Sequence, residues 1–230
     1  MPRPLRITIP NLPFHIIDRG NNKQVIFQDD GDFFYFLKLI ERYKKELKFK
    51  LYHLCLMPNH IHLIIEPTVE GTLSMTMMRL TLAYSSYFNQ KNKSVGHVWQ
   101  GRYKSSLIGE EGYFITCALY IELNPVRAKM VVHPQNYQWS SYNLYAFGQA
   151  HLLIEKIIDL DPYYLKLGDN DIERQKKYKE NINMVMKEDY LKNLREQLYQ
   201  GVYGNDNFVR TMKEKFKIGS LKKVGRPSKK

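Results

Sequence analysis

Apolar and polar residues follow two different periods along the first 130 residues. Short apolar or alternating runs, bounded by turn residues, are typical of β-strands. The runs that we expect to form strands are residues 14–18, 50–56, 60–66 and 102–108. The second and third runs flank Met57-Pro58-Asn59, which is suited to a tight hairpin turn.

Longer segments with apolar residues at helical spacing lie between these runs. One predicted helix runs from about Asp32 to Leu47, and a second runs from Thr72 or Ser74 towards Gln90. In the second helix, three apolar residues share one side: Met75, Met78 and Leu82.

A third predicted helix opens with Glu110 and Glu111, whose charges favour the positive end of the helix dipole. It should end or kink at Asn124-Pro125, because proline disfavours helical geometry in the residue before it.

The order of these elements is strand, helix, strand, strand, helix, strand, and then a further helix. The first six form the split βαβ arrangement of a ferredoxin-like sandwich, so we expect an α+β fold. Two helices should cover one sheet face, and the other face can bind a ligand or receive the third helix. The composition becomes more helical and charged after Gly148, which predicts a domain of residues 1–148, a helical region of residues 149–218 and a disordered basic tail of residues 219–230.

Hydrophobic residues make up 43% of the 230 residues, which is enough for a packed core. No apolar run approaches the roughly 18 residues of a membrane span, and the start of the chain lacks the apolar stretch of a signal peptide. We therefore expect a soluble, cytoplasmic protein with no membrane partner. Cys55 and Cys117 lie among apolar neighbours and are interpreted as buried free thiols.

The net charge of +12 indicates a polyanionic partner, although charge alone does not separate DNA from RNA. Residues 210–230 contain nine Lys or Arg and one Glu, so they contribute +8 of this charge. Within them, Gly225-Arg226-Pro227 is flanked by lysines and is similar to the core of minor-groove-binding hooks. Arg226 is therefore a candidate DNA contact.

His60 and His62 are separated by one residue on a predicted strand, so both imidazoles face the same side. Neutral imidazoles on an open sheet face can bind a metal, but an isolated His-x-His is more often an ordinary pair of polar-face residues. Tyr120 and Asn124 are four residues apart on the third helix and share a face. A tyrosine nucleophile close to metal ligands could attack a phosphate.

Basic and aromatic residues accompany these positions. Arg102 and Lys104 alternate on the fourth predicted strand, and Arg127 follows Asn124 by three residues. Trp99 lies just before Arg102. Aromatic planes beside cations are typical of single-stranded nucleic-acid binding, so these four residues are candidate DNA contacts.

Five segments together resemble the REP-associated tyrosine transposases, which belong to the single-tyrosine HUH transposase superfamily. They are FHIIDRGNN (14–22), MPNHIHLII (57–65), GHVWQGRYKS (96–105), YIELNPVRA (120–128) and YQWSSY (137–142). The likeness covers roughly residues 10–148. Members often carry a basic residue just before the tyrosine, whereas this chain has Leu119.

The resemblance implies a ferredoxin-like HUH fold in which Tyr120 is the nucleophile. It also implies that His60, His62 and Asn124 bind a divalent metal, Mg²⁺ or Mn²⁺. The implied reaction cleaves and rejoins single-stranded DNA near a hairpin through a 5′-phosphotyrosine. Relatives that act as monomers and as homodimers are both known, so the oligomeric state stays open.

Three other functions are compatible with parts of this pattern. A replication initiator or relaxase shares the HUH chemistry. A non-catalytic nucleic-acid-binding module uses the same sandwich, with aromatic residues on the sheet where this chain has histidines. A metal-dependent hydrolase would use an activated water, but no carboxylate pair accompanies the histidines.

Overall fold

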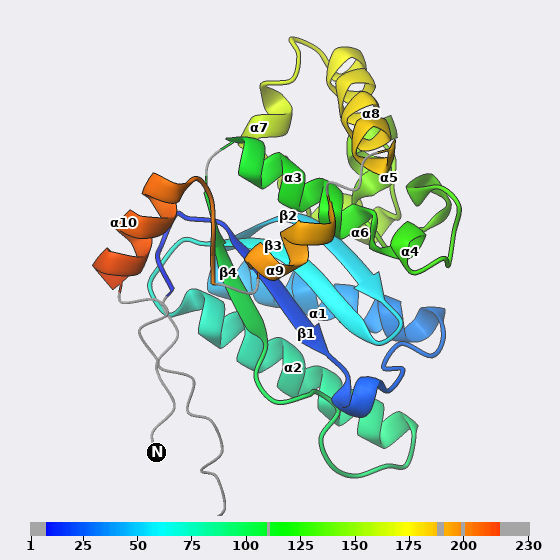
Figure 1. The fold of residues 1–230 in the computed structure, drawn as a ribbon. Helices are drawn as coiled ribbons and strands as arrows, with labels where there is room; N and C mark the ends of the chain where they lie inside the picture. Colours follow the sequence, from blue (N-terminus) through cyan, green and yellow to red (C-terminus); the bar gives the residue numbers. More distant parts are fainter. Residues whose placement is uncertain (1–7, 110, 188–190, 199–200, 217–230) are drawn as a thin grey trace, which may run out of the picture.

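The computed structural model describes residues 8–109, 111–187, 191–198 and 201–216. Its centre is a five-stranded sheet with the order β2-β3-β1-β4-β5 (Figure 1). The first four of these strands pair antiparallel in the order of a ferredoxin-like sandwich, which confirms the predicted α+β fold. The strands are β1 (Phe14–Arg19), β2 (Phe49–Met57), β3 (His60–Pro67), β4 (Lys104–Ile108) and β5 (Val202–Tyr203).

Two long helices cover one face of the sheet, α1 (Asp30–Leu47) and α2 (Thr72–Lys91). The side chain of Asp29 caps the first turn of α1 by accepting a hydrogen bond from the backbone N–H of Asp32. The buried carboxylate of Asp32 in turn accepts from the Tyr87 hydroxyl and the Lys91 ammonium, at 2.9 and 2.6 Å. These bonds tie the start of α1 to the end of α2.

The packing side of α2 differs from the side that its apolar pattern suggested. Met78 and Leu82 are 53% and 68% exposed, and Met75 is exposed with them. The residues that pack against the core are Leu73, Met77, Leu80, Tyr84 and Phe88. The apolar residues of α2 lie on more than one side of the helix, so their periodicity alone does not show which face packs against the sheet.

The opposite sheet face receives α3 (Glu111–Glu122), and α7 (Pro162–Leu165) and α8 (Asp171–Lys187) lie on the side of α3 away from the sheet (Figure 1). Every residue from Cys117 to Glu122 is buried, so this helix has no solvent-facing stripe along its second half. The helix ends before Asn124-Pro125 as predicted, and the short α4 (Asn124–Arg127) follows it.

The chain after Gly148 returns to the first half through specific contacts. The Lys44 ammonium pairs with the Asp159 carboxylate at 2.7 Å, and the backbone N–H of Leu51 donates to the same carboxylate at 2.9 Å. The two-residue strand β5 extends the sheet in parallel with β4, and the sequence pattern did not predict it. The remaining elements are η1 (Asn21–Lys23), η2 (Pro134–Asn136), α5 (Tyr142–Phe147), α6 (Leu152–Ile157), α9 (Leu191–Leu198) and α10 (Asp206–Phe216).

Both cysteines, Cys55 and Cys117, are buried free thiols, as expected. Among the helices of the described residues, none is long and apolar enough to cross a membrane.

Candidate functional site

The two histidines of β3 lie on the sheet face that α3 covers. The strand alternates its side chains, so His60 and His62 point to the same side, with their ring centroids 5.0 Å apart. The Nδ1 of His60 is 2.6 Å from the Oδ1 of Asn59 in the hairpin turn. His60 is half-buried and His62 is buried, so the pair connects the interior of the sandwich to its surface.

A third histidine, His15 on β1, joins this pair. Its Nε2 is 2.9 Å from the Nδ1 of His62, and the two rings are stacked with an interplanar angle of 4°. Burial lowers the pKa of His15 to about 3. Burial, followed by the neighbouring charges of His15 and His60, holds the pKa of His62 well below its usual value. Both imidazoles are therefore neutral, as metal ligation requires.

His15 was not among the site residues predicted from the sequence. The register between β1 and β3 places Ile17 opposite His62 and His15 opposite Ile64, so all four side chains share one face. The alternation in β1 placed His15 and Ile17 on the same side, but only the pairing of the strands brings the two imidazoles into contact.

Tyr120 extends from α3 onto this cluster and is only 3% exposed. Its ring lies edge-on to His15 and His62, with centroid distances of 6.2 and 6.0 Å. The guanidinium of Arg127, on α4, lies 4.7 Å from the centroid of the same ring, a cation–π contact. The structure thus brings together Tyr120, the histidines and one of the candidate DNA-binding cations.

Asn124 lies one turn after Tyr120, at the break between α3 and α4. Its Nδ2 donates to the carbonyls of Tyr120 and Ile121, at 2.9 and 3.0 Å, and so closes the end of α3. These bonds use the amide hydrogens and leave the Oδ1 as the group that can accept a bond or coordinate a cation.

The donor set suits a divalent metal only if several ligand types are combined. Across the described parts of the chain, His, Cys, Asp and Glu side chains form no group of three or more that could hold a metal ion. In the predicted set, His60 and His62 would supply two ring nitrogens and Asn124 would supply an amide oxygen. Such a set leaves room for oxygen ligands from water or phosphate, which Mg²⁺ and Mn²⁺ accept readily.

The other candidate DNA contacts occupy different surroundings. β4 begins at Lys104, so Arg102 lies in the bend before the strand and the predicted alternation of the two on one strand is wrong. Arg102 and Lys104 nevertheless line one small cavity together. Arg226 lies outside the described residues.

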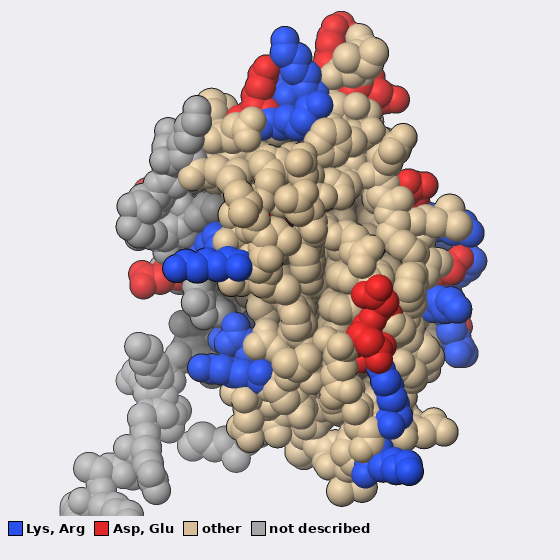
Figure 2. All heavy atoms as spheres, turned by 90° about the vertical axis from the view of Figure 1, so that its right-hand side faces the viewer, with Lys and Arg blue, Asp and Glu red and all other residues tan. Residues whose placement is uncertain are grey.

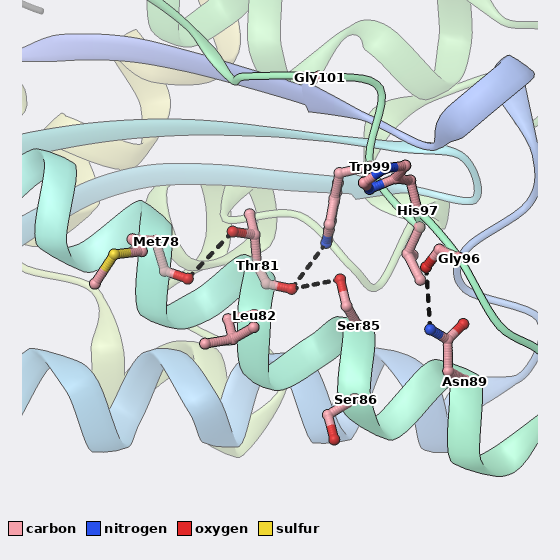
Figure 3. Close-up of a pocket in the computed structure, with 11 residues that line it drawn as sticks. Met78, Thr81, Leu82, Ser85, Ser86, Asn89, Gly96, His97, Trp99 and Gly101 are labelled. Carbon is pink, nitrogen blue, oxygen red and sulfur yellow. Dashed lines mark hydrogen bonds between the residues drawn. The ribbon is translucent and has the colours of Figure 1, made fainter. Parts of the chain in front are cut away.

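Trp99 is 7% exposed and packs against the two helices, where its ring lies tilted to those of Phe36 on α1 and Tyr84 on α2. Its indole N–H donates to the Thr81 carbonyl on α2 at 3.1 Å. Figure 3 shows the edge of this ring at a hollow between α2 and residues 96–101. Most of the ring is committed to the core, so its contact with DNA stays a prediction.

A buried network on the far side of α3 was missed by the sequence analysis. Glu122 is fully buried and accepts from Ser141 at 2.7 Å and from Tyr178 at 2.6 Å. The ring of His53, on β2, lies 3.0 Å from Glu122 through Nδ1 and 3.0 Å from Asp161 through Nε2. The network therefore connects β2, α3, α8 and the cap of α7.

The charge of His53 follows from these contacts. Burial alone would lower its pKa, but the hydrogen bonds to Asp161 and Glu122 and their charges outweigh burial and raise the pKa to about 9. A ring that donates from both nitrogens to two carboxylates is an imidazolium.

The fold and site together define a class: a ferredoxin-like sandwich with a His-hydrophobic-His strand facing a helix-borne tyrosine. A family model of IS200-like transposases matches residues 8–124, which is just over half of the chain. The chain therefore belongs to the IS200-like transposase family. This membership confirms the resemblance to single-tyrosine transposases and supports an enzyme that acts on DNA.

The structure of a REP-associated tyrosine transposase bound to a REP hairpin is similar to this fold, with a TM-score of 0.54 and 18% identity, covering 66% of this chain and 90% of that one. The crystal structure of a candidate transposase from Deinococcus radiodurans R1 matches with a TM-score of 0.37 and 16% identity, over 48% of this chain and 88% of that one. Only the first match establishes a shared fold. A search of curated protein sequences found no match.

Proposed function

We propose that this protein cleaves and rejoins single-stranded DNA near hairpins, with Tyr120 as the nucleophile. The observation that carries the proposal is the placement of the Tyr120 ring, 6.0 Å from the ring of His62 and beside the guanidinium of Arg127. A phenol, neutral imidazoles and a cation meet there on one sheet face. The similar transposase is bound to a REP hairpin, which supports hairpin DNA as the partner.

The proposed reaction exchanges one phosphate ester for another. The Tyr120 oxygen attacks the phosphorus and its phenol loses a proton, while the departing 3′-oxygen takes one up. The products are a 5′-phosphotyrosine and a free 3′-hydroxyl, and the reverse reaction rejoins an end without external energy. Arg127, whose guanidinium lies 4.7 Å from the centroid of the Tyr120 ring, would bind the attacked phosphate and stabilise its developing charge.

We further propose that His60, His62 and Asn124 hold a divalent ion, Mg²⁺ or Mn²⁺. Such an ion would polarise the attacked phosphate and stabilise the charge that develops on it. For His62 to ligate through Nε2, its Nδ1 must keep the proton and donate it to His15. The 2.9 Å contact between these two nitrogens is compatible with that tautomer of His62, in which His15 accepts the bond.

The test is a covalent adduct between protein and DNA. We expect that incubation with labelled single-stranded hairpin oligonucleotides and Mn²⁺ produces a slow band that survives a denaturing gel. Tyr120→Phe should fold and bind DNA but lose the adduct and the cleavage by several orders of magnitude.

Tyr113→Phe is the matched control, because Tyr113 lies on the same helix but packs on Tyr203, with ring centroids 5.0 Å apart. An adduct that persists in Tyr120→Phe and disappears in Tyr113→Phe would move the nucleophile to Tyr113. Absence of any adduct in the wild-type chain would leave the non-catalytic DNA-binding function.

A further inference from the structure

A small basic cavity lies where β1 ends and the chain enters β4. Its volume is about 270 Å³. The backbone N–H of Gln100 donates to the Arg19 carbonyl at 2.7 Å, which holds the two walls together. The lining residues are Ile17, Asp18, Arg19, Gln100, Arg102 and Lys104.

The charges of the lining favour an anion. Arg19, Arg102 and Lys104 supply three positive charges against the single negative charge of Asp18. The Asp18 carboxylate accepts from the backbone N–H of Arg19 at 3.0 Å. Three positive charges against one negative charge give the lining a net positive charge, and the size of the cavity suits one small anionic group.

Arg19 carries a second, independent indication of a ligand. Its Nε is buried and has no hydrogen-bond partner among the residues that the structure describes. Buried donors are nearly always paired, because leaving one without an acceptor forfeits its hydration. An anion in the cavity would supply the missing acceptor. A guanidinium is well suited to this, because its planar donors match the geometry of a phosphate.

The strand register places this cavity next to the candidate site. Arg19 lies opposite His60 in the β1–β3 pairing. Lys104 lies opposite Ile17, which in turn lies opposite His62, so the three form one row on the same sheet face. Two strand spacings separate the ends of this row, which is about 10 Å.

We propose that this cavity binds a phosphate of the DNA strand that neighbours the phosphate attacked by Tyr120, with Arg19 as its principal donor. The proposal rests on the proposed function, because the DNA path is defined by the position of Tyr120. The strand would then cross the sheet from β3 over β1 to β4. Arg19 and Lys104 would fix which phosphate reaches the tyrosine.

The experiment measures which phosphate contacts Arg19. The Tyr120→Phe chain is titrated with single-stranded hairpin oligonucleotides in which one phosphate at a time is replaced by an uncharged methylphosphonate. We expect one position near the cleaved bond to weaken binding by about 10-fold or more, since hydrogen bonds between charged groups are strong. In the double variant Tyr120→Phe/Arg19→Gln, the same replacement should have little further effect, as for two groups that contact each other.

A second cavity variant and a control variant complete the experiment. Lys104→Gln, made in the Tyr120→Phe chain, alters an exposed side chain of the same cavity. It should reduce the loss of binding that the methylphosphonate causes at the same phosphate, so it provides a test even if Arg19→Gln proves unstable. Arg42→Gln makes the same chemical change on α1, on the other side of the sheet, and should leave the whole methylphosphonate profile unchanged.

Equal methylphosphonate profiles in Tyr120→Phe and in both cavity variants would overturn the proposal. Because Tyr120→Phe cannot form the adduct, this binding experiment is independent of catalysis. If the Arg19 substitution and the methylphosphonate replacement are coupled but the wild-type chain cleaves no DNA, only the proposed function is contradicted. Cleavage without coupling would contradict only the phosphate cavity.

Discussion

The contact between His15 and His62 determines which ring nitrogen of His62 can bind a ligand. With Nδ1 of His62 occupied by His15 at 2.9 Å, only Nε2 remains to ligate a metal. His60 is held in the same way, because its Nδ1 faces Asn59 at 2.6 Å. In both rings Nδ1 thus contacts a neighbouring side chain, an arrangement that orients the histidine ligands of many metal sites.

His62→Ala should abolish cleavage in Mn²⁺ and leave hairpin binding nearly intact, because the proposed metal acts on the attacked phosphate and not on the hairpin. His60→Ala should behave alike. The measurements are a cleavage gel and a binding titration, with His97→Ala, in the exposed loop before β4, as the control. Cleavage that persists undiminished in excess chelator would contradict the metal proposal.

At the scale of elements, α3 makes buried polar contacts on two sides. Tyr120 faces the histidines on one side, while Glu122 is anchored to His53 and Tyr178 on the other. Breaking a buried ionic network by removing one partner is costly, since the remaining charges stay buried. The position of the tyrosine helix is therefore coupled to β2 and α8.

This network predicts a stability that depends on pH. The pKa of His53 is raised in the folded state, to about 9 from an ordinary value of 6.5. Its contribution is thus fully present below about pH 6.5 and is lost as pH rises through about 9, an effect of about 3 kcal/mol at most.

The measurement is the free energy of unfolding in urea between pH 6 and 9.5, for the wild-type chain and for His53→Gln. We expect the advantage of the wild-type chain to shrink across this window, because Gln carries no charge that can be lost. Parallel curves for the two chains would show that the imidazolium is not the cause.

At the scale of the whole molecule, the positive charge is unevenly distributed. Residues 210–230 carry +8 of the net +12. Figure 2 shows one face on which the Lys and Arg side chains of the described residues stand at the margins, while the centre consists mainly of uncharged side chains. Long-range attraction of DNA should therefore depend strongly on the C-terminal segment.

Deleting residues 219–230 removes four Lys and Arg226. We expect weaker binding of duplex or hairpin DNA, mainly at low salt, with the cleavage position unchanged. The slope of log affinity against log salt should become shallower, because fewer counterions are released. Identical affinity and slope for the truncated and full-length chains would exclude the tail as a DNA contact.

Local periodicity was sufficient for the parts of the site that lie within one element. A strand repeats every two residues, so the shared face of His60 and His62 follows from their spacing alone. The helix break at Asn124-Pro125 follows from the covalent geometry of proline. The order of strands and helices was likewise enough to predict the ferredoxin-like sandwich.

Contacts between distant segments were decided only by the tertiary structure. His15 meets His62, and Arg19 lies beside His60, because of the register between β1 and β3, which no local pattern encodes. Glu122 and His53 are 69 residues apart and pair only when α3 packs on β2. The packing side of α2 was settled in the same way, since its apolar residues offered more than one face and only the sheet selects among them.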